Sequence, residues 1–396
     1  MVAPMLRFKD FDESWPSVPL KNFVSFRKGK GVSKADIHED GIFECIRYGE
    51  LYTTYGQVIT TIKSRTNISP SESILSQSGD VIIPASGETQ IDIATASCIA
   101  KENIILGGDL NILSHQESGE WLAYYLSSAK KLEIAQLAQG NSVVHLYSSQ
   151  LKELKVNKPT KEEQTKIASF LSAVDEKIAQ LAQKRHLLDQ YKQGMMQKLF
   201  SQQIRFKADD GSEFGEWVEY KLGEISTTFS GGTPKSTNKE FFIGTIPFIK
   251  SGEISKKHTD QFINELALKE SSAKLVKKGD LLYALYGATS GQVALSQIDG
   301  AINQAVLCIR SKHNTKYLLN FFLWKKDSIL STYLQGGQGN LSAAILKEIL
   351  IPVPCLEEQT KIANFLSAID QKIDVASEQL EQAKLWKKGL LQQMFV

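Results

Sequence analysis

Two segments of this chain are almost the same. "EEQTKIASFLSAVDEKI" runs from Glu162 to Ile178, and "EEQTKIANFLSAIDQKI" runs from Glu357 to Ile373. Fourteen of the seventeen positions are identical, and the other three are Ser/Asn, Val/Ile and Glu/Gln. In both copies apolar residues recur at alternating steps of four and three, which is the period of a coiled-coil helix. The repetition therefore predicts two equivalent long helices, and it determines how the rest of the chain is divided.

The coiled-coil period continues beyond the quoted segments in both copies. Arg185, Lys192 and Lys387 occupy seam positions, so either helix alone would be only marginally stable as a coiled coil. Each helix offers the 3.5-residue seam that the other needs, and we expect the two to pair. The predicted seam consists of Ile167, Leu171, Val174, Ile178, Leu181 and Leu188 in the first helix and Ile362, Leu366, Ile369, Ile373, Leu380 and Leu390 in the second.

The duplication extends over the whole chain. "RFKDFDESW" from Arg7 matches "RFKADDGSEFGEW" from Arg205, and "SGDVIIPASGET" from Ser78 matches "KGDLLYALYGAT" from Lys278. Ahead of each long helix lie β-branched and aromatic runs, turn residues and helical patterns such as that at 118–138, which together predict a mixed α/β domain. The predicted order is domain 1 at 1–158, helix 1 at 159–203, domain 2 at 204–354 and helix 2 at 355–396.

Composition indicates a globular protein with no obvious metal site. The chain has 396 residues, of which 42% are hydrophobic and 23% charged, and no stretch reaches the apolar length of a membrane span. The first residues lack the apolar core of a secretion signal. The four cysteines are scattered, which fits a reducing cytoplasm and argues against a thiolate metal site. The net charge of +2 is far from that of a strongly basic nucleic-acid domain, so any charge that binds DNA must be concentrated locally.

The helices are nearly identical, whereas the domains have diverged. Residues off the seam are repeated too, and pairing of the helices does not require that. One interpretation is that two copies of one partner dock on equivalent helix surfaces. The alternatives are a coiled coil with a purely structural role and a recent duplication that drifted unevenly. The candidate docking residues are Glu162, Glu163, Gln164, Lys166, Glu357, Glu358, Gln359 and Lys361.

These features resemble the specificity subunit of type I restriction–modification systems. The resemblance is carried by two diverged domains, each followed by a helix that opens "EEQTKIA.FLS..D.KI" and closes "K.G..Q..F". Further phrases in the second domain are similar to target-recognition domains of that family: "FSGGTPKS" (229–236), "GTIPFIKSGEI" (244–254), "LYGATSGQVAL" (285–295) and "AINQAVLCI" (301–309).

The resemblance implies a non-catalytic DNA-recognition subunit that acts in the cytoplasm. Each domain would read one half of a split, asymmetric sequence in double-stranded DNA. The helices would pack antiparallel, set the spacing between the halves and dock two methyltransferase subunits, which restriction subunits would then join. This chain would carry no cofactor, and its partners would use S-adenosylmethionine, ATP and Mg²⁺.

Lysine and arginine usually supply phosphate contacts, and loop residues with polar side chains usually supply base contacts. We therefore expect DNA-binding residues in the polar loops of both domains. The candidates in the first domain are Arg27, Lys28, Lys30, Lys34, Arg47, Tyr48, Lys63, Arg65, Ser86, Thr89 and Gln90. The candidates in the second domain are Thr233, Lys235, Lys239, Lys250, Lys256, Lys257, His258, Tyr286, Thr289, Ser290 and Gln292.

The sequence shows no catalytic motif. It contains no Asn/Asp-Pro-Pro-aromatic motif for adenine methylation, no phosphate-binding loop with the required spacing and no H-E-x-x-H. Two other interpretations use the same repeats. One is a duplicated coiled-coil adaptor that binds two protein partners and no nucleic acid. The other is the specificity subunit of a system whose methylase and nuclease are fused.

Overall fold

The chain forms two compact units, and each long helix contributes to both. The computed structural model describes residues 4–140, 142–333 and 341–395. Unit 1 comprises Met1–Ala182 and Glu378–Val396, and unit 2 comprises Gln183–Ser377. Each unit therefore contains one α/β domain together with the first half of one helix and the second half of the other.

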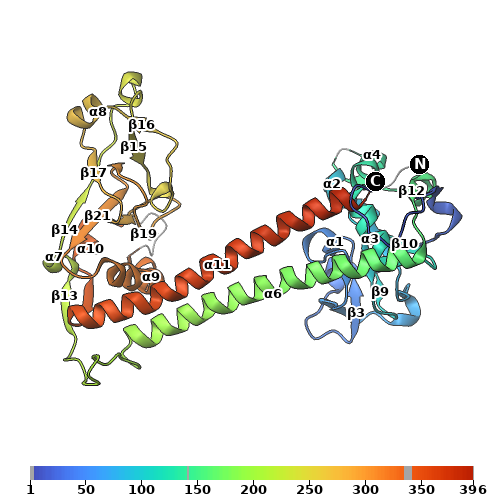
Figure 1. Ribbon diagram of the computed structural model, residues 1–396, viewed down its shortest axis with the longest axis horizontal. Coiled ribbons are helices and arrows are strands. Elements are labelled where there is room, and N and C mark those ends of the chain that lie inside the picture. Colours follow the sequence, from blue (N-terminus) through green and yellow to red (C-terminus); the bar gives the residue numbers. More distant parts are fainter. Residues whose placement is uncertain (1–3, 141, 334–340, 396) are drawn as a thin grey trace. The chain divides into compact units, whose positions relative to one another are not determined.

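Two sheets form the first domain (Figure 1). A five-stranded sheet has the order β2-β10-β6-β8-β4, and a three-stranded sheet has the order β5-β3-β9. The central strand β6 is the apolar run predicted from the sequence, and all four of its residues are buried. The sheet strands are β2 Ser25–Lys28, β3 Phe43–Ile46, β4 Val58–Ile59, β5 Ser64–Thr66, β6 Val81–Pro84, β8 Ser97–Ile99, β9 Ile105–Leu106 and β10 Leu110–Ser114; the pairs β1 Ser17–Pro19 with β12 Lys155–Asn157 and β7 Ser86–Gly87 with β11 Val144–His145 lie outside them.

Helix α3 (Gly119–Ser128) provides the three largest fully buried side chains of this domain, Trp121, Tyr124 and Tyr125. Ser118 caps it, because its hydroxyl accepts a hydrogen bond from the N–H of Trp121. The helical pattern at 118–138 is not one helix, since the chain turns at Ala129 and Lys130 before α4 begins. The other helices are α1 Glu50–Thr53, α2 Gln90–Ile93, α4 Lys131–Leu137 and α5 Ser148–Glu153.

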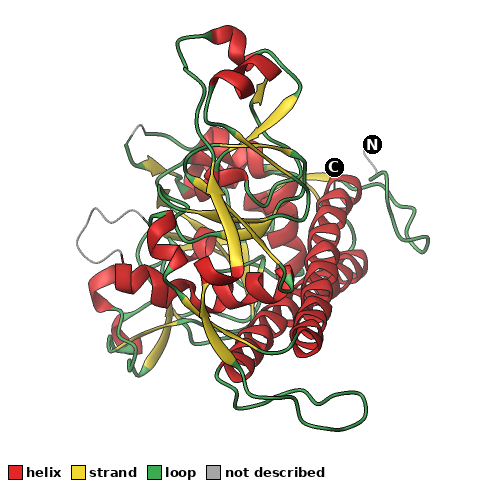
Figure 2. Cartoon of the chain, turned by 90° about the vertical axis from the view of Figure 1, so that its left-hand side faces the viewer, coloured by secondary structure: helices red, strands yellow, loops and turns green. Residues whose placement is uncertain are grey.

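The second domain repeats this architecture (Figure 2). Its sheet order β14-β21-β18-β19 corresponds to β2-β10-β6-β8, and the parallel pair β15–β20 corresponds to β3–β9. The mixed α/β fold predicted for both domains is confirmed. The strands are β13 Val218–Lys221, β14 Ser226–Ser230, β15 Ile246–Ile249, β16 Phe262–Ile263, β17 Lys274–Val276, β18 Leu281–Ala284, β19 Val293–Leu295, β20 Gly300–Ile302, β21 Val306–Ser311 and β22 Leu350–Val353; the helices are α7 Leu222–Ile225, α8 Glu265–Glu270, α9 Thr315–Tyr333 and α10 Ala343–Lys347.

The two long helices begin and end close to the predicted positions. Helix α6 spans Lys161–Phe200, and α11 spans Leu356–Met394. Thr160 is the first cap, because its Oγ1 accepts a hydrogen bond from the N–H of Glu163 at 3.4 Å.

Within each unit the two helix segments run in opposite directions. In unit 1 the beginning of α6 packs on the end of α11, where the rings of Phe170 and Trp386 lie 6.1 Å apart, edge to face. The N–H of Leu6 donates to the carbonyl of Gln393 nearby, so the first described residues lie beside the end of α11 (Figure 1). In unit 2 the end of α6 packs on the beginning of α11. The pairing is therefore antiparallel, as the family resemblance implied.

Charged seam residues join the two helices instead of interrupting them. In unit 1 Lys387 of α11 forms an ion pair with Asp175 of α6 at 2.5 Å. In unit 2 Lys192 of α6 forms the equivalent ion pair with Asp370 of α11 at 2.6 Å. Both pairs recur because both helices repeat a lysine near the end and an aspartate near the start.

The apolar seam continues into the domain cores. In unit 1 Ile167 and Leu171 of α6 and Leu390 of α11 belong to the same buried cluster as Trp121 of the domain. Of the predicted seam residues, only Ile178, Leu188 and Ile373 are half-buried, and the other nine are buried. The helix ends are thus part of each domain's core.

A buried carboxylate anchors each helix to its own domain. In unit 1 Arg7 donates to Glu163 through Nε at 2.7 Å and Nη2 at 2.8 Å, and the indole N–H of Trp15 donates to Oε2 at 3.1 Å. In unit 2 Arg205 donates to Glu358 at 3.1 and 2.8 Å, and Trp217 donates at 2.9 Å. The side chains of Glu163 and Glu358 are 1% and 0% exposed.

The glutamines that follow these two glutamates also attach each long helix to its own domain. Gln164 accepts a hydrogen bond from the N–H of Ser118 at 3.0 Å, and Gln359 accepts one from the N–H of Asn314 at 2.9 Å. Each glutamine therefore holds the N-terminus of α3 or α9.

These contacts correct the expected docking surface. Glu163, Gln164, Glu358 and Gln359 are buried and cannot face a partner. Lys166 and Lys361 reach the domain as well, through ion pairs with Asp10 and Asp209. Of the eight candidates, only Glu162 and Glu357 are exposed and form no ion pair or side-chain hydrogen bond with the described residues. Anchoring of the domains explains most of the repetition off the seam.

The substitution Arg7→Met should loosen the start of α6, because it leaves the Glu163 carboxylate buried without its cation. Removing one partner of a buried ion pair costs about 3 kcal/mol, which corresponds to about 100-fold faster exchange of amide hydrogens that open with this contact. Hydrogen exchange in the first turns of α6 measures this.

Lys21→Met is the matched control, because Lys21 and Glu153 form an exposed ion pair with side chains 48% and 66% exposed. Loss of such a pair costs less than about 1 kcal/mol. Equal exchange rates in the two variants would contradict the anchoring role of Glu163.

Candidate functional site

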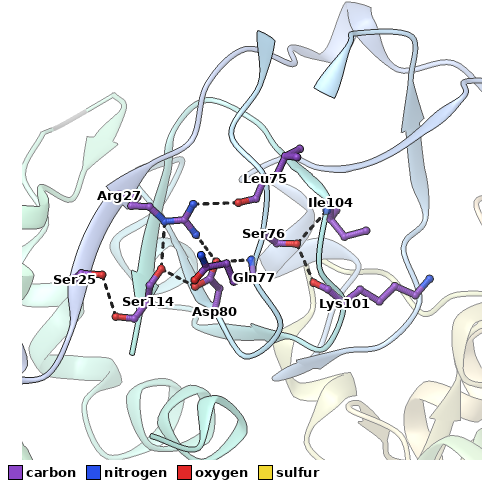
Figure 3. Close-up of polar contacts among 9 residues, drawn as sticks. All are labelled: Ser25, Arg27, Leu75, Ser76, Gln77, Asp80, Lys101, Ile104 and Ser114. Atoms are coloured by element: carbon purple, nitrogen blue, oxygen red, sulfur yellow. Dashed lines mark hydrogen bonds and ion pairs between the residues drawn. The ribbon is translucent and has the colours of Figure 1, made fainter. Parts of the chain in front are cut away.

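Arg27, a predicted DNA contact, is held inside the first domain. Figure 3 shows its guanidinium between Leu75, Asp80 and Ser114: it donates to Asp80 Oδ2 at 2.5 Å, to the carbonyl of Leu75 at 3.1 Å and to Ser114 Oγ at 3.2 Å. Asp80 is only 2% exposed and also accepts from the N–H of Gln77 at 2.8 Å. Arg27 therefore neutralises a buried turn carboxylate, and its side chain stays 34% exposed, so that its contact with DNA remains a prediction.

The second domain has the same ion pair with the cation on a different strand. Asp280 accepts from the N–H of Lys277 at 2.8 Å and binds the Arg310 guanidinium at 2.6 Å. By strand register Arg310 on β21 corresponds to Ser114, while the position of Arg27 is taken by Phe229. The guanidinium of Arg310 lies 5.1 Å from the centre of the Phe229 ring. The turn aspartate and its arginine thus recur, with the aspartate half-buried in unit 2, and the strand that supplies the arginine differs.

Electrostatics at Asp280 agree with this geometry. Burial disfavours the ionised carboxyl, but the Arg310 guanidinium and the N–H of Lys277 outweigh burial, and the pKa of Asp280 is lowered. The carboxyl therefore remains ionised near neutral pH.

The other two candidate arginines of the first domain also have internal partners. Arg47 pairs with the buried Glu50 at 3.2 Å. Arg65 donates to the carbonyls of Gly41 at 2.6 Å and Ile42 at 2.9 Å. These contacts close loops and leave the two guanidiniums less free for the bidentate contact that typically reads guanine.

The candidate lysines of the first domain are free by comparison. Lys28, Lys30, Lys34 and Lys63 are exposed, and none forms an ion pair with the residues that the structure describes. Among the remaining candidates, Ser86 is buried and Tyr48 is half-buried. Thr89 caps α2 through Asp92, and Gln90 donates to the carbonyl of Ala138 at 3.5 Å.

The candidate loops of the second domain meet through a residue that the sequence analysis did not select. Gln304 accepts a hydrogen bond from the Thr233 hydroxyl at 2.5 Å and also hydrogen-bonds Tyr286. It therefore connects the glycine-rich loop after β14 with the loop after β18. The latter also approaches the loop after β15, because a Cβ on Gly252 would lie 3.9 Å from the Thr289 methyl group. A signal existed, since Gln304 lies within the phrase "AINQAVLCI".

Exposed cations surround these loops. Lys235, Lys239, Lys256, Lys257 and His258 are exposed and form no ion pair within the described part of the chain. Lys250 is half-buried, Gln292 is exposed, and Ser290 donates to the carbonyl of Leu285 at 3.0 Å. Uncompensated cations beside polar loop tips can bind the phosphates of a nucleic acid.

Other site chemistries find no support in the described residues. Across 4–140, 142–333 and 341–395, no group of three or more His, Cys, Asp or Glu side chains could hold a metal ion. The helices in these ranges also include none that is long and apolar enough to cross a bilayer.

Comparison with protein families gives two matches along this chain. The model for the type I restriction modification DNA specificity domain matches residues 12–190 and again residues 215–385. The two matches correspond to the two sequence repeats.

Two relatives from Methanocaldococcus jannaschii are similar over long stretches. The putative type I restriction enzyme MjaX specificity subunit is 29% identical over 287 residues, which cover 68% of this chain and 66% of that protein, just under two thirds of it. The type I restriction enzyme MjaVIII specificity subunit is 25% identical over 407 residues, which cover 96% of this chain and 91% of that protein.

A solved structure shares the fold. The S subunit of a type I restriction-modification system from M. genitalium superposes with a TM-score of 0.66 over 100% of this chain and 99% of that chain. The sequence identity is 19%.

The substitution Arg27→Phe should destabilise unit 1 by about 3 kcal/mol, because it leaves Asp80 buried without its cation. Adding Ser114→Arg should recover most of that loss, since it places the cation on the strand that carries it in unit 2. Chemical unfolding of the two single variants and the double variant measures the coupling. A double variant no more stable than Arg27→Phe would refute the equivalence of the two arginine positions.

Proposed function

The chain belongs to the type I restriction modification DNA specificity family, and from this premise we propose that it reads a DNA target in two parts, one with each unit, and docks two methyltransferase subunits. Each domain contributes one half-site reader. The target is asymmetric, because the two domains carry different loops. The chain itself is not an enzyme in this proposal, and it works in the cytoplasm.

The observation that carries the proposal is that the internal structure of the two units recurs, whereas their exposed loops differ. Sheet order, the buried Glu163 and Glu358, and the glutamines beside them recur in both units. The exposed loop residues do not recur: unit 1 offers Lys28, Lys30 and Lys34, whereas unit 2 offers Lys256, Lys257 and His258. A shared frame with different loops suits a protein that holds two different sequences in an equivalent way.

Phosphate and base contacts divide between residue types in this proposal. The exposed lysines bind backbone phosphates as point charges, because they have no internal partners. The loops joined by Gln304 read base edges in unit 2. Double-stranded DNA has a two-fold symmetric backbone, which suits two equivalent domains on an antiparallel helix pair.

Partner subunits complete the function. In this proposal restriction subunits join after the methyltransferase subunits, and the partners carry S-adenosylmethionine, ATP and Mg²⁺. A fused methylase–nuclease partner would use the same surfaces of this chain. The adaptor interpretation predicts no DNA binding by the assembled complex.

A repeated glycine indicates where the methyltransferase subunits dock. Gly194 and Gly389 occupy equivalent helix positions, and a Cβ on either would meet no atom of the described residues within 4 Å. Glycine inside a helix costs about 1 kcal/mol relative to alanine, so the fold of this chain does not favour it. In the last 22 positions of the helices, ending at Phe200 and Phe395, the residues that recur are Lys192/Lys387, Gly194/Gly389, Gln197/Gln392 and Phe200/Phe395.

Contacts within this chain account for two of those four pairs but not for the glycines. Lys192 and Lys387 form the interhelical ion pairs, and Phe200 and Phe395 are buried. An exposed aromatic residue precedes each glycine by three positions, Tyr191 at 51% exposure and Trp386 at 54%. We place the docking surface on these aromatic–glycine patches, because a glycine lets a partner approach the helix backbone closely.

Co-expression with the methyltransferase subunit encoded beside this chain tests the DNA function. We expect new adenine methylation in host DNA at a two-part motif, on both strands, that depends on this chain; single-molecule sequencing detects it. Lys256→Glu with Lys257→Glu should weaken methylation at every such site. An assembled complex that adds no methylation and binds no DNA would favour the adaptor interpretation.

Gly194→Leu together with Gly389→Leu should weaken methyltransferase docking by at least 10-fold while making the helices intrinsically more stable. Quantitative co-purification and thermal unfolding measure the two effects.

Gln183→Leu with Glu378→Leu is the matched control, since both residues are exposed and occupy equivalent helix positions. Unchanged docking of the glycine variant would move the docking surface elsewhere. Absence of docking by the wild-type chain would reject the function itself.

A further inference from the structure

A pocket in unit 1 lies where unit 2 places a tryptophan. The pocket has a volume of about 530 Å³ and lies between the end of α3 and the end of α11. Its lining includes Ser128 and Lys131 from the domain, Lys388, Leu391 and Gln392 from α11, and Phe395 directly after α11. Unit 2 is an internal reference for what this place can hold.

The equivalence of the two places rests on their hydrogen bonds and ring contacts. Ser118 and Asn314 cap α3 and α9 and donate to Gln164 and Gln359, which aligns the two helices. Three positions further, Trp121 corresponds to Tyr317. Ser128 therefore corresponds to Trp324.

The aromatic packing below the pocket supports this alignment. The ring of Tyr125 packs edge to face on Phe395 at 5.5 Å, and the ring of Phe321 packs in the same way on Phe200 at 5.8 Å.

In unit 2 Trp324 fills the place. Its ring stacks on Phe200 at 5.3 Å with 19° between the planes, and its indole N–H donates to Gln197 Oε1 at 2.8 Å. Phe200 and Gln197 correspond to Phe395 and Gln392 of unit 1. The two groups that bind the indole in unit 2 are an aromatic ring and an amide oxygen. Both are therefore present in unit 1 as well.

In unit 1 none of the described residues places a ring where the indole lies in unit 2. The Ser128 hydroxyl turns back to the carbonyl of Tyr124 at 2.5 Å and fills none of the space. The chain also leaves the helical path at Ala129 and Lys130, whereas α9 continues to Tyr333. Gln392 is exposed, and its amide forms no hydrogen bond with the residues described here.

Charge at the rim indicates what kind of group enters. Lys131 and Lys388 both line the pocket, and neither forms an ion pair in the described ranges. Two unpaired cations beside an apolar floor favour an aromatic group that carries carboxylates nearby.

We propose that this pocket binds the aromatic side chain of an acidic segment of a protein partner, with an indole occupying the place of Trp324. The site goes beyond the proposed function, because neither DNA reading nor docking on the aromatic–glycine patches requires it. It makes the two units unequal: unit 2 is closed by its own tryptophan, and unit 1 takes one from outside.

A short acidic peptide tests the site on the full-length chain. The probe is acetyl-Glu-5-fluorotryptophan-Glu-Asp-amide, followed by fluorine NMR at low salt, and the same peptide with 4-fluorophenylalanine compares a smaller ring. We expect saturable binding of one peptide per chain, tighter for the indole and weakened by added salt. No saturable binding would overturn the proposal.

Two variants locate the bound peptide. Ser128→Trp should fill the pocket, raise the midpoint of thermal unfolding and weaken peptide binding at least 10-fold. Leu132→Trp is the control, because Leu132 is 69% exposed and does not line the pocket; its affinity should stay within twofold of wild type. Unchanged binding by Ser128→Trp would overturn the proposal.

A surface variant covers the case in which Ser128→Trp does not fold. Lys388→Glu changes an exposed residue and should weaken binding of the acidic peptide several-fold at low salt, with little effect at high salt. Binding by Lys388→Glu equal to that of the wild type at low salt would contradict the inference.

Discussion

The rest of each unit depends on a carboxylate buried at the first turn of its long helix. Glu163 and Glu358 are almost fully buried, and each is gripped by an arginine and a tryptophan from the segment that opens its domain. Burying an ion pair is favourable only when its geometry and hydrogen bonds are good. These contacts therefore hold the helix in one orientation on the domain. The glutamine that follows extends the anchor to the next helix, and the seam residues extend it into the core.

Because this anchor recurs in both units, the attachment of each domain to the helices is the same while other positions of the two units differ. Each unit has the same sheet order and the same attachment to the helices. The surrounding positions tolerate substantial change, as the ion pairs of Asp80 and Asp280 illustrate, since their arginines come from different strands. The pocket beside Phe395 is another difference, because Ser128 stands where unit 2 has Trp324. The proposed reading of two unequal half-sites requires this kind of inequality on a common frame.

Sequence reasoning succeeded where a pattern repeats along the chain. It failed where a side chain has several possible partners that the sequence does not distinguish. The 3.5-residue period predicted both helices within a few residues of their ends. The apolar runs predicted central strands such as β6. Sequence reasoning did not show that Arg27, Arg47 and Arg65 have internal partners in Asp80, Glu50 and the carbonyl of Gly41. A charged loop residue has the same sequence signature whether its partner is an internal carboxylate or a phosphate.

The duplication, the helices, the α/β class of both domains and the family were all determined by the linear pattern of residues, because periodicity and repetition are properties of the chain itself. The tertiary structure decided which repeated residues face inward. Glu163 and Gln164 resemble a polar helix surface in the sequence, and only the packing of the domain against α6 buries them. The role of Gln304 and the pocket beside Phe395 were decided there too, because both arise from segments far apart in the chain that meet only in the folded unit.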